Sequence, residues 1–192
     1  MSRQYWQEAL AWATASGTAI ASSATETILF PNVTIPANYI QDGRLLRMQA
    51  FGAYGTTATP TLIITVRWGG VSGTVLCKTG AMVTTSGTGG GASLTATWML
   101  RLNIQCRSNG STGTLMSNGH LVLYTSTVGT AGTVTNYGMD QPIVSGSTGG
   151  TTPVVVTADL TADTALSLTA KWSASDPANS IQGLNYLLEG LN

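Results

Sequence analysis

A run of alternating side chains between Leu94 and Arg107 constrains the fold of this chain more than any other feature. Apolar residues occupy every second position of the run: Leu94, Ala96, Trp98, Leu100, Leu102, Ile104 and Cys106. Polar residues occupy the positions between them, with Met99 as the one apolar exception. A helix would place Arg101 on the same side as Trp98, whereas a β-strand separates the two classes of side chain. The run therefore predicts a long strand with one buried face and one wet face.

The same alternation recurs along the chain. It predicts further strands at 62–68, 166–172 and 184–188, less regular ones at 44–54 and 115–125, and short ones at 27–30, 75–78, 81–84 and 153–158. Turn residues separate them, and Ser108-Asn109-Gly110 predicts a tight hairpin. Roughly eight or more strands at regular spacing predict an all-β domain. We expect an antiparallel β-sandwich of the jelly-roll type, and the spacing leaves an immunoglobulin-like sandwich open as the alternative.

Residues 1–23 differ from the rest and are predicted to form an N-terminal arm on a sandwich domain of residues 24–192. The arm is rich in Ala, Ser and Thr, and it carries Tyr5, Trp6, Leu10 and Trp12. Leu10 follows Trp6 by four positions, which permits a short helix. Aromatic anchors on a mobile segment often mark docking surfaces. Two hypotheses follow: these four residues bind a partner, or the arm folds back onto its own domain.

The chain carries very little charge. Only 8% of its 192 residues are charged, against about 25% in an ordinary soluble protein. Eight basic and eight acidic residues are scattered singly, so the net charge is zero and no basic patch predicts nucleic-acid binding. No apolar run reaches the length of about 18 residues that a membrane-spanning segment needs. A neutral surface does not oppose self-association, so we expect a multimer.

No residue pattern predicts catalysis, a cofactor or a metal site. The single histidine, His120, has no second ligand at suitable spacing on its strand. Asp159 and Asp163 are interpreted as turn residues, and the glycine-rich stretch 87–91 as a loop tip. The two cysteines, Cys77 and Cys106, fit buried free thiols, or a single bridge if their strands are neighbours. We therefore do not expect an enzyme.

Two stretches resemble a known group of proteins. The first comprises residues 24–31 (ATETILFP), 34–38 (TIPAN) and 43–47 (GRLLR), and the second comprises 175–181 (SDPANSI) and 186–192 (YLLEGLN). In order and position they resemble structural proteins encoded by tailed bacteriophages and prophages, which carry such segments at either end of a Thr-rich β core. Pro177-Ala178 stands where the group has a Gly-containing turn, and residues 1–23 have no clear counterpart.

The resemblance implies a virion component with a jelly-roll-type fold. Its expected role is that of a capsid decoration (cement) protein, assembled in the host cytoplasm and bound on the capsid exterior. The implied partners are the shell of the major capsid protein and further copies of the chain itself, as a homotrimer. The alternatives are a head-fibre or tail-associated domain that contacts a receptor glycan through the loops 86–92 and 145–152, and a non-viral adhesive β-domain.

Overall fold

Antiparallel β-strands build the described part of the chain, which comprises residues 6–56, 60–84, 94, 96–124, 139–149 and 152–192 of the computed structural model. The strands are β1 (Gln7–Trp12), β2 (Ile20–Ala21), β3 (Thr27–Ile28), β4 (Val33–Ile35), β5 (Leu45–Gly55), β6 (Thr61–Trp68), β7 (Thr74–Lys78), β8 (Met82–Val83), β9 (Ala96–Ser108), β10 (Gly113–Tyr124), β11 (Met139–Ser145), β12 (Val156–Ala158), β13 (Thr164–Trp172) and β14 (Ser180–Leu191). The described residues include no helix that is long and apolar enough to cross a membrane. The prediction of an all-β, antiparallel fold is confirmed.

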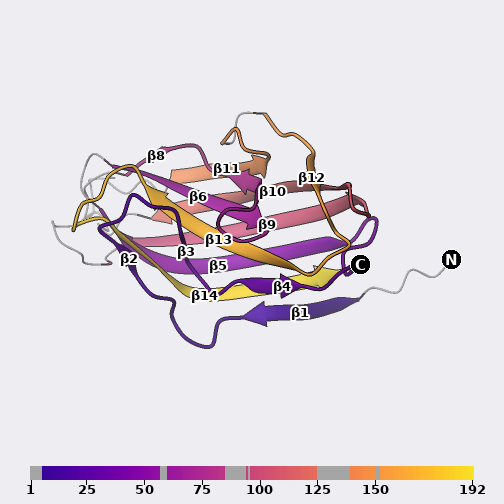
Figure 1. Cartoon of the computed structure of the whole chain (residues 1–192). Helices are drawn as coiled ribbons and strands as arrows, with labels where there is room; N and C mark the ends of the chain where they lie inside the picture. The colour runs from indigo at the N-terminus through magenta and orange to yellow at the C-terminus, as the bar shows by residue number, and fades with distance from the viewer. Residues whose placement is uncertain (1–5, 57–59, 85–93, 95, 125–138, 150–151) are drawn as a thin grey trace, which may run out of the picture.

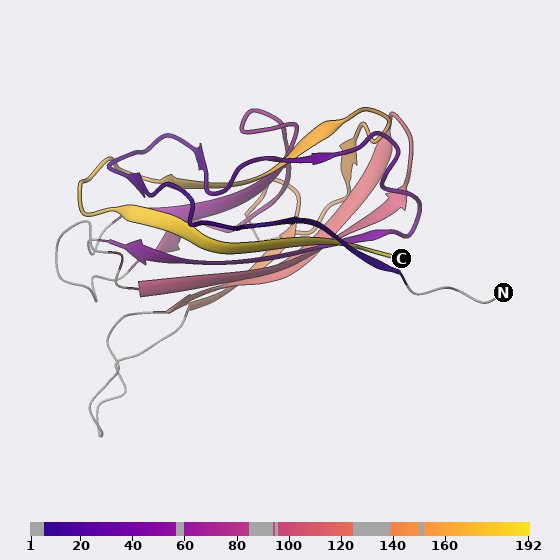
Figure 2. The ribbon, with the colours of Figure 1, turned by 90° about the horizontal axis from the view of Figure 1, so that it is seen from below.

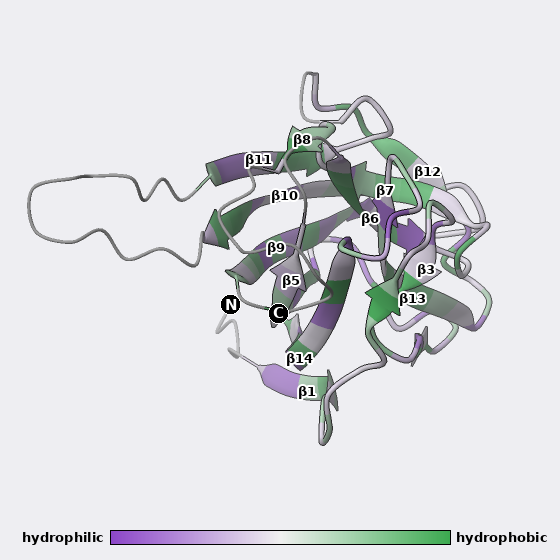
Figure 3. Cartoon of the chain, turned by 90° about the vertical axis from the view of Figure 1, so that its left-hand side faces the viewer, coloured by the Kyte–Doolittle hydropathy of each residue, from purple (hydrophilic) through white to green (hydrophobic). Residues whose placement is uncertain are grey.

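The strands form one curled sheet. Its order is β1-β14-β5-β9-β10-β11-β7-β6-β13-β3, with β2 on β14, β4 on β13, β8 on β6 and β12 on β10. Figure 1 shows the strands side by side, and Figure 3 shows the arc that runs from β1 through β14, β5, β9 and β10 to β11. The sheet bends until β13 and β6 lie across from β5 and β9, so that one face is enclosed and the other is turned to solvent.

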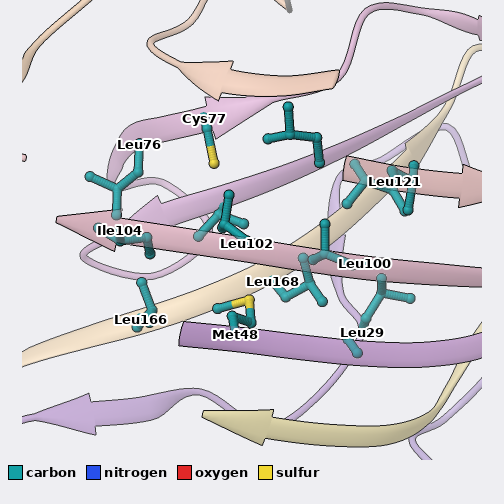
Figure 4. Packing of buried hydrophobic residues seen from close by; sticks show 14 of the residues in the cluster. Leu29, Met48, Leu76, Cys77, Leu100, Leu102, Ile104, Leu121, Leu166 and Leu168 are labelled. Carbon is teal, nitrogen blue, oxygen red and sulfur yellow. The ribbon is translucent and has the colours of Figure 1, made fainter. Parts of the chain in front are cut away.

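Side chains from strands far apart in the sequence meet inside this curl (Figure 4). Leu188 lies opposite Met48, which lies opposite Leu102, so three strands contribute to one row. Leu168 of β13 points into the same interior. The inward stripe predicted for the longest run is confirmed, because its members in β9 are all buried: Ala96, Trp98, Leu100, Leu102, Ile104 and Cys106. Trp68 and Trp172 are buried as well.

Most predicted strands agree with the structure to within a few residues, and four strands were not predicted: β1, β2, β4 and β11. The tight turn after β9 is present, with Gly110 at a φ of 117°. Asp42 holds this turn from the neighbouring connection, because its carboxylate accepts the Asn109 N–H at 2.6 Å. The predicted loop tip at 87–91 lies outside the described residues.

The segments that carry the resemblance are neighbours in space and fix backbone turns. Asn38 adopts a φ of 57°, in the left-handed region that Asn tolerates better than most residues. Its N–H donates to the Leu160 carbonyl at 2.8 Å, and its carbonyl accepts from Gln41. Buried Asn179 uses its carbonyl to accept the Ser22 N–H at 3.1 Å, which joins the end of the chain to its beginning. These residues serve the fold itself.

Glu26 holds β3 against the sheet. Its carboxylate accepts two hydrogen bonds from the Arg67 guanidinium, at 2.6 and 2.7 Å, and one from the Thr169 hydroxyl at 2.5 Å. The hydrogen bond from Arg67 is the main cause that holds the pKa of Glu26 below its ordinary value. Both side chains are about four-fifths buried, with exposed fractions of 18% and 20%, so solvent screens the pair less than it screens a surface pair.

This pair predicts an acid-sensitive contribution to stability. A carboxyl whose pKa is depressed in the folded state stabilises the fold above its unfolded pKa, and the contribution is lost as the pH falls through the folded pKa. We expect Glu26→Gln to lower the free energy of unfolding by about 1.5–3 kcal/mol at pH 7. The deficit should shrink as the pH falls below 4.5.

Urea unfolding of both proteins between pH 7 and pH 2.5 measures this difference. Asp140→Asn, which removes an exposed carboxylate, controls for the loss of one negative charge. Parallel stability curves for the wild type and Glu26→Gln across this range would contradict the assignment.

Candidate functional site: the N-terminal strand and the outer sheet face

Two of the predicted arm residues, Leu10 and Trp12, lie on β1 at the border of the sheet, and Trp6 directly precedes this strand. β1 pairs with β14, with Gln7 opposite Leu191 and Trp12 opposite Leu187, and Figures 1 and 2 show the two strands side by side. A strand forms where a helix was considered, because β14 supplies the hydrogen-bonding partner. For β1 and β2 the structure shows the alternative in which the arm folds back onto its own domain. The binding of a partner by this segment stays a prediction.

The four predicted contact residues have different environments. Leu10 is half-buried and packs against the core. Trp12 points outward and is 63% exposed, the largest exposed fraction of any large apolar side chain in the described chain. Trp6 is exposed and lies against Arg44. Tyr5 lies outside the described residues. Trp12 and Trp6 are therefore accessible to a partner, whereas Leu10 helps to pack β1 against the core.

Arg44 fastens the start of β1 to the body. Its guanidinium lies 4.8 Å from the centre of the Trp6 ring and 4.4 Å from that of Tyr39, which are cation–π distances. It also donates to the Tyr39 carbonyl at 2.6 Å and to the Asn192 side chain at 3.1 Å. The Asn192 N–H in turn donates to the Trp6 carbonyl at 3.1 Å. One cation thus ties together the first described residue, the connection before β5 and the last residue.

Two acidic side chains hold the rest of β1. The Tyr39 hydroxyl donates to Glu8 at 3.1 Å. Burial, followed by this hydrogen bond, raises the pKa of Tyr39 to about 12, so the hydroxyl keeps its proton for the bond. The Gln7 amide donates to Glu189, which also lies 3.8 Å from Arg47. These polar contacts give β1 a defined register on β14.

An apolar band crosses the solvent face of the sheet and consists of Trp12, Leu187, Phe51, Met99 and Val122. The register places them in two adjacent rows: Trp12 is opposite Leu187, while Phe51 is opposite Met99, which is opposite Val122. The band spans β1, β14, β5, β9 and β10. Met99 was the apolar exception on the wet face of the longest strand, and the band accounts for it. Phe51 and Leu187 were not predicted, although alternation with inward Met48 and Leu188 was a signal for both.

A shallow hollow of about 310 Å³ lies within the band. Phe51, Met99 and Leu187 line it together with Gln49, Arg101 and Asn185. Phe51 is 39% exposed, so part of this residue is accessible to solvent. The hollow therefore combines a partly accessible aromatic residue with planar polar groups among its lining residues.

A larger cavity, the seam cavity, lies where the two ends of the curled sheet approach each other. It measures about 1020 Å³ and is bordered by residues 10–21 on one side and 27–34 on the other, with Ser23 and Tyr186 completing it. Not one of its lining residues is charged, Leu10, Ile28 and Val33 among them. Part of the rim is the connector between β1 and β2, residues 13–19. The cavity thus favours uncharged occupants.

The described polar groups do not converge into a reaction centre. His120 and Asp140 lie 3.2 Å apart on the open face, with 67% and 61% of their side chains exposed. The Asp159 carboxylate accepts from the backbone and hydroxyl of Thr161, which lowers its pKa. Asp163 accepts the Ala37 N–H at 2.8 Å. In the described ranges no three His, Cys, Asp or Glu side chains are grouped so that they could hold a metal ion.

Both cysteines are free thiols in the interior. Cys77 lies on β7 and Cys106 on β9, and these strands are not neighbours in the sheet. Burial raises the pKa of the Cys77 thiol to about 12, which suppresses the reactive thiolate. Of the two alternatives left by the sequence, the structure shows unbridged thiols.

Comparison with known proteins returned no relatives. No protein-family model, curated protein or solved structure matches the chain.

Arg44 offers a direct test of how firmly β1 is attached. Arg44→Ala removes the cation between the rings of Trp6 and Tyr39 and two hydrogen bonds. We expect amide hydrogen exchange in β1 to accelerate roughly tenfold, since about 1.4 kcal/mol of local stability corresponds to that factor. Exchange in β9 and β10 should stay unchanged.

Arg107→Ala is the matched control, because Arg107 is exposed on β9 and pairs with no described residue. Equal protection of β1 in both variants would mean that Arg44 does not anchor this strand.

Proposed function

We propose that this chain is a structural component of a tailed-bacteriophage virion, a capsid decoration protein that binds the outer surface of the assembled shell. The observation that carries the proposal is the apolar band on the open face of the sheet, in a chain of which only 8% of the residues are charged. Contiguous exposed apolar surface marks protein–protein contact sites, and charged residues are depleted from the centres of such contacts. The resemblance of the terminal segments to phage structural proteins supplies the choice of partner.

The spatial arrangement of the resembling segments supports this reading. Arg44, Asn38 and Glu26 belong to the first stretch, and Asn179 to the second. Each makes contacts that join distant parts of the sheet. Residues with such tasks recur when a fold is shared, whatever a particular protein binds. The segments therefore point to a shared scaffold, and of the apolar band they contribute only Leu187.

We assign the scaffold to the jelly-roll type because of its nested strand pairing. β9 pairs with β10, β7 with β11, β6 with β13 and β5 with β14. Pairs nested in this way arise when one long antiparallel hairpin is wrapped into a curled body. Additional pairing of β5 with β9 joins the two halves into a continuous sheet.

A decoration protein of this kind stabilises the shell by mass action, because it binds the assembled form and not the separate subunits. Trp12 and Phe51 are suited to anchor such a contact, since aromatic side chains supply much of the energy of interfaces. A homotrimer of the chain would present three copies of the band to the shell, and avidity would compensate for modest affinity at each copy.

The hollow around Phe51 favours a second candidate function, a head-fibre or tail-associated domain that binds a receptor glycan. A sugar ring could stack on Phe51 while Gln49, Asn185 and Arg101 hydrogen-bond to its hydroxyl groups. Of the loops suggested for this role by the sequence, 86–92 lies outside the described residues. Part of 145–152 is described, and there Thr148 donates to the Thr152 carbonyl.

Copy number separates the two functions. A decoration protein is expected at a stoichiometry comparable to that of the major capsid protein, whereas a fibre or tail domain is present in a few copies per particle. Quantitative mass spectrometry of virions from a phage or induced prophage that encodes the chain measures this ratio. Absence of the chain from purified particles would refute both virion roles.

The apolar band predicts a loss of shell binding when Trp12 is truncated. Because a buried Trp anchor contributes about 2 kcal/mol or more, we expect Trp12→Ala to weaken binding to undecorated shells about 30-fold or more without lowering the melting temperature. Val83→Ala, at a residue of β8 that is 55% exposed and outside the band, should bind as the wild type does. Co-sedimentation with shells measures both, and equal binding would exclude the band as the contact.

A further inference from the structure

β1 is attached to the rest of the molecule in an unusual way. It pairs with β14 alone and lies at one end of the strand order. Side chains of β1 and of Trp6 just before it make polar and cation–π contacts to residues of the body: Glu8 to Tyr39, Gln7 to Glu189, and Trp6 to Arg44. The strand therefore behaves as a separate piece with its own docking site, and the connector is its one covalent tie to that site.

The connector, residues 13–19, makes few contacts of its own. Beyond the Ala13 N–H bond that ends the β1 ladder, its backbone donates one hydrogen bond to the sheet, from Gly17 N–H to the Gly183 carbonyl at 2.8 Å. The Gln182 side chain returns one to the Gly17 carbonyl at 2.8 Å. The other residues are Ala, Thr and Ser, which contribute little apolar area. In Figure 1 the connector loops out from the border of the sheet before it returns to β2.

The connector touches the body mainly at two points, because Ala13 packs against the core and the Gly17 backbone lies close to the Leu29 carbonyl. Its residues border the seam cavity of about 1020 Å³ instead of filling it. A segment with little buried apolar area and few backbone hydrogen bonds has low local stability. Rearranging the connector consequently costs little, whereas undocking β1 without a replacement would expose the edge of β14 and several polar partners.

We propose that β1 is an exchangeable strand, and that copies of this chain associate by placing β1 of one copy on β14 of the next. Exchange preserves every contact between β1 and its site, because donor and acceptor are identical in each copy. Only the connector changes its path. Strand exchange is a low-cost route to symmetric oligomers, and the neutral surface of this chain raises no electrostatic barrier to close approach.

Concentration decides between the closed and the exchanged form. A short tether gives β1 an effective concentration in the millimolar range at its own site. Dilute protein therefore favours the closed form described above, and crowding at an assembly surface favours exchange. This inference does not rest on the proposed function, because it concerns the purified chain alone.

Two variants, each with one introduced cysteine, test the exchange. Trp12 and Leu187 lie directly opposite each other on the solvent face, within reach of a cross-strand disulfide. Trp12→Cys and Leu187→Cys are prepared separately with tags of different mass, mixed at about 1 mM, which matches the effective concentration of a short tether, and oxidised mildly. A covalent heterodimer then forms where β1 of one chain lies on β14 of another.

The control pair comes from the interior of the same sheet. Gln49 on β5 and Arg101 on β9 are also directly opposite and exposed on the same face, but these strands cannot exchange without unfolding. We expect at least tenfold more heterodimer from Trp12→Cys with Leu187→Cys than from Gln49→Cys with Arg101→Cys. The double variant Trp12→Cys/Leu187→Cys should give covalent oligomers at about 1 mM and internally bridged monomer at about 1 µM.

Equal heterodimer yields from the two pairs, or a double variant that is bridged only internally at both concentrations, would overturn the proposal. All four substitutions lie outside the core, and near-ultraviolet circular dichroism verifies that the variants fold. If one of the first pair does not fold, sedimentation of the unaltered chain provides the second measurement: oligomers are expected at about 1 mM and monomers at about 1 µM, and monomers at both concentrations would overturn the proposal. The native thiols do not interfere, since both are buried.

Discussion

The antiparallel ladder between β5 and β14 is the interaction on which the rest of the structure depends. It joins the first long strand to the last one over eleven register positions, from Leu45 opposite Leu191 to Gly55 opposite Ser180. Its register decides which side chains enter the core. Leu188 and Met48 point inward as a pair, while their neighbours Leu187 and Gln49 point outward. A slip by one residue would exchange the two sets, so a single register defines both the core and the apolar band.

The same two strands also make the sheet curl. A Cβ at Gly52 would lie 2.0 Å from the Gln182 carbonyl oxygen and 2.5 Å from the Trp98 indole nitrogen, and one at Gly183 would lie 2.3 Å from the Phe30 ring. The aromatic rings thus occupy the space that side chains would need. The register shifts next to Gly183, which marks a bulge, and bulges with glycines bend strands. Trp98 and Phe30 fill the tight side of that bend.

The long strands were predictable because the alternation of apolar and polar residues is visible within each strand. Alternation over β9 specifies its inward face without knowledge of any partner. β1 was not predicted, since its small residues and its irregular pairing between Ala9 and Ala11 hide the alternation, and it becomes a strand only beside β14. β11 was obscured by Pro142, which is unexpected in a central strand. Pro142 is accommodated because β7 pairs only with Val144 and Ser145, further along β11.

Only part of the apolar band was predictable from the sequence, because the band depends on which strands are neighbours. Trp12 was selected for its residue type, whereas Phe51 and Leu187 lay within strands whose register the sequence did not give. A band across five strands is a property of the pairing, so its members come together only when every neighbour is known. Leu10, in contrast, was predicted to contact a partner, but its side chain packs against the core of its own domain.

The acidic side chains of this weakly charged chain are engaged in contacts within the molecule. All eight acidic side chains have a partner within the described chain: Glu8, Glu26, Asp42, Asp140, Asp159, Asp163, Asp176 and Glu189. Most of these contacts pin a turn or a border strand. A carboxylate that is largely buried in such a contact, as those of Glu26 and Glu189 are, need not be stripped of water when another surface approaches, and desolvation of free charges is a major cost of association. The acidic charges thus mainly secure the scaffold, while Arg101 and Arg107 stay exposed on the outer face.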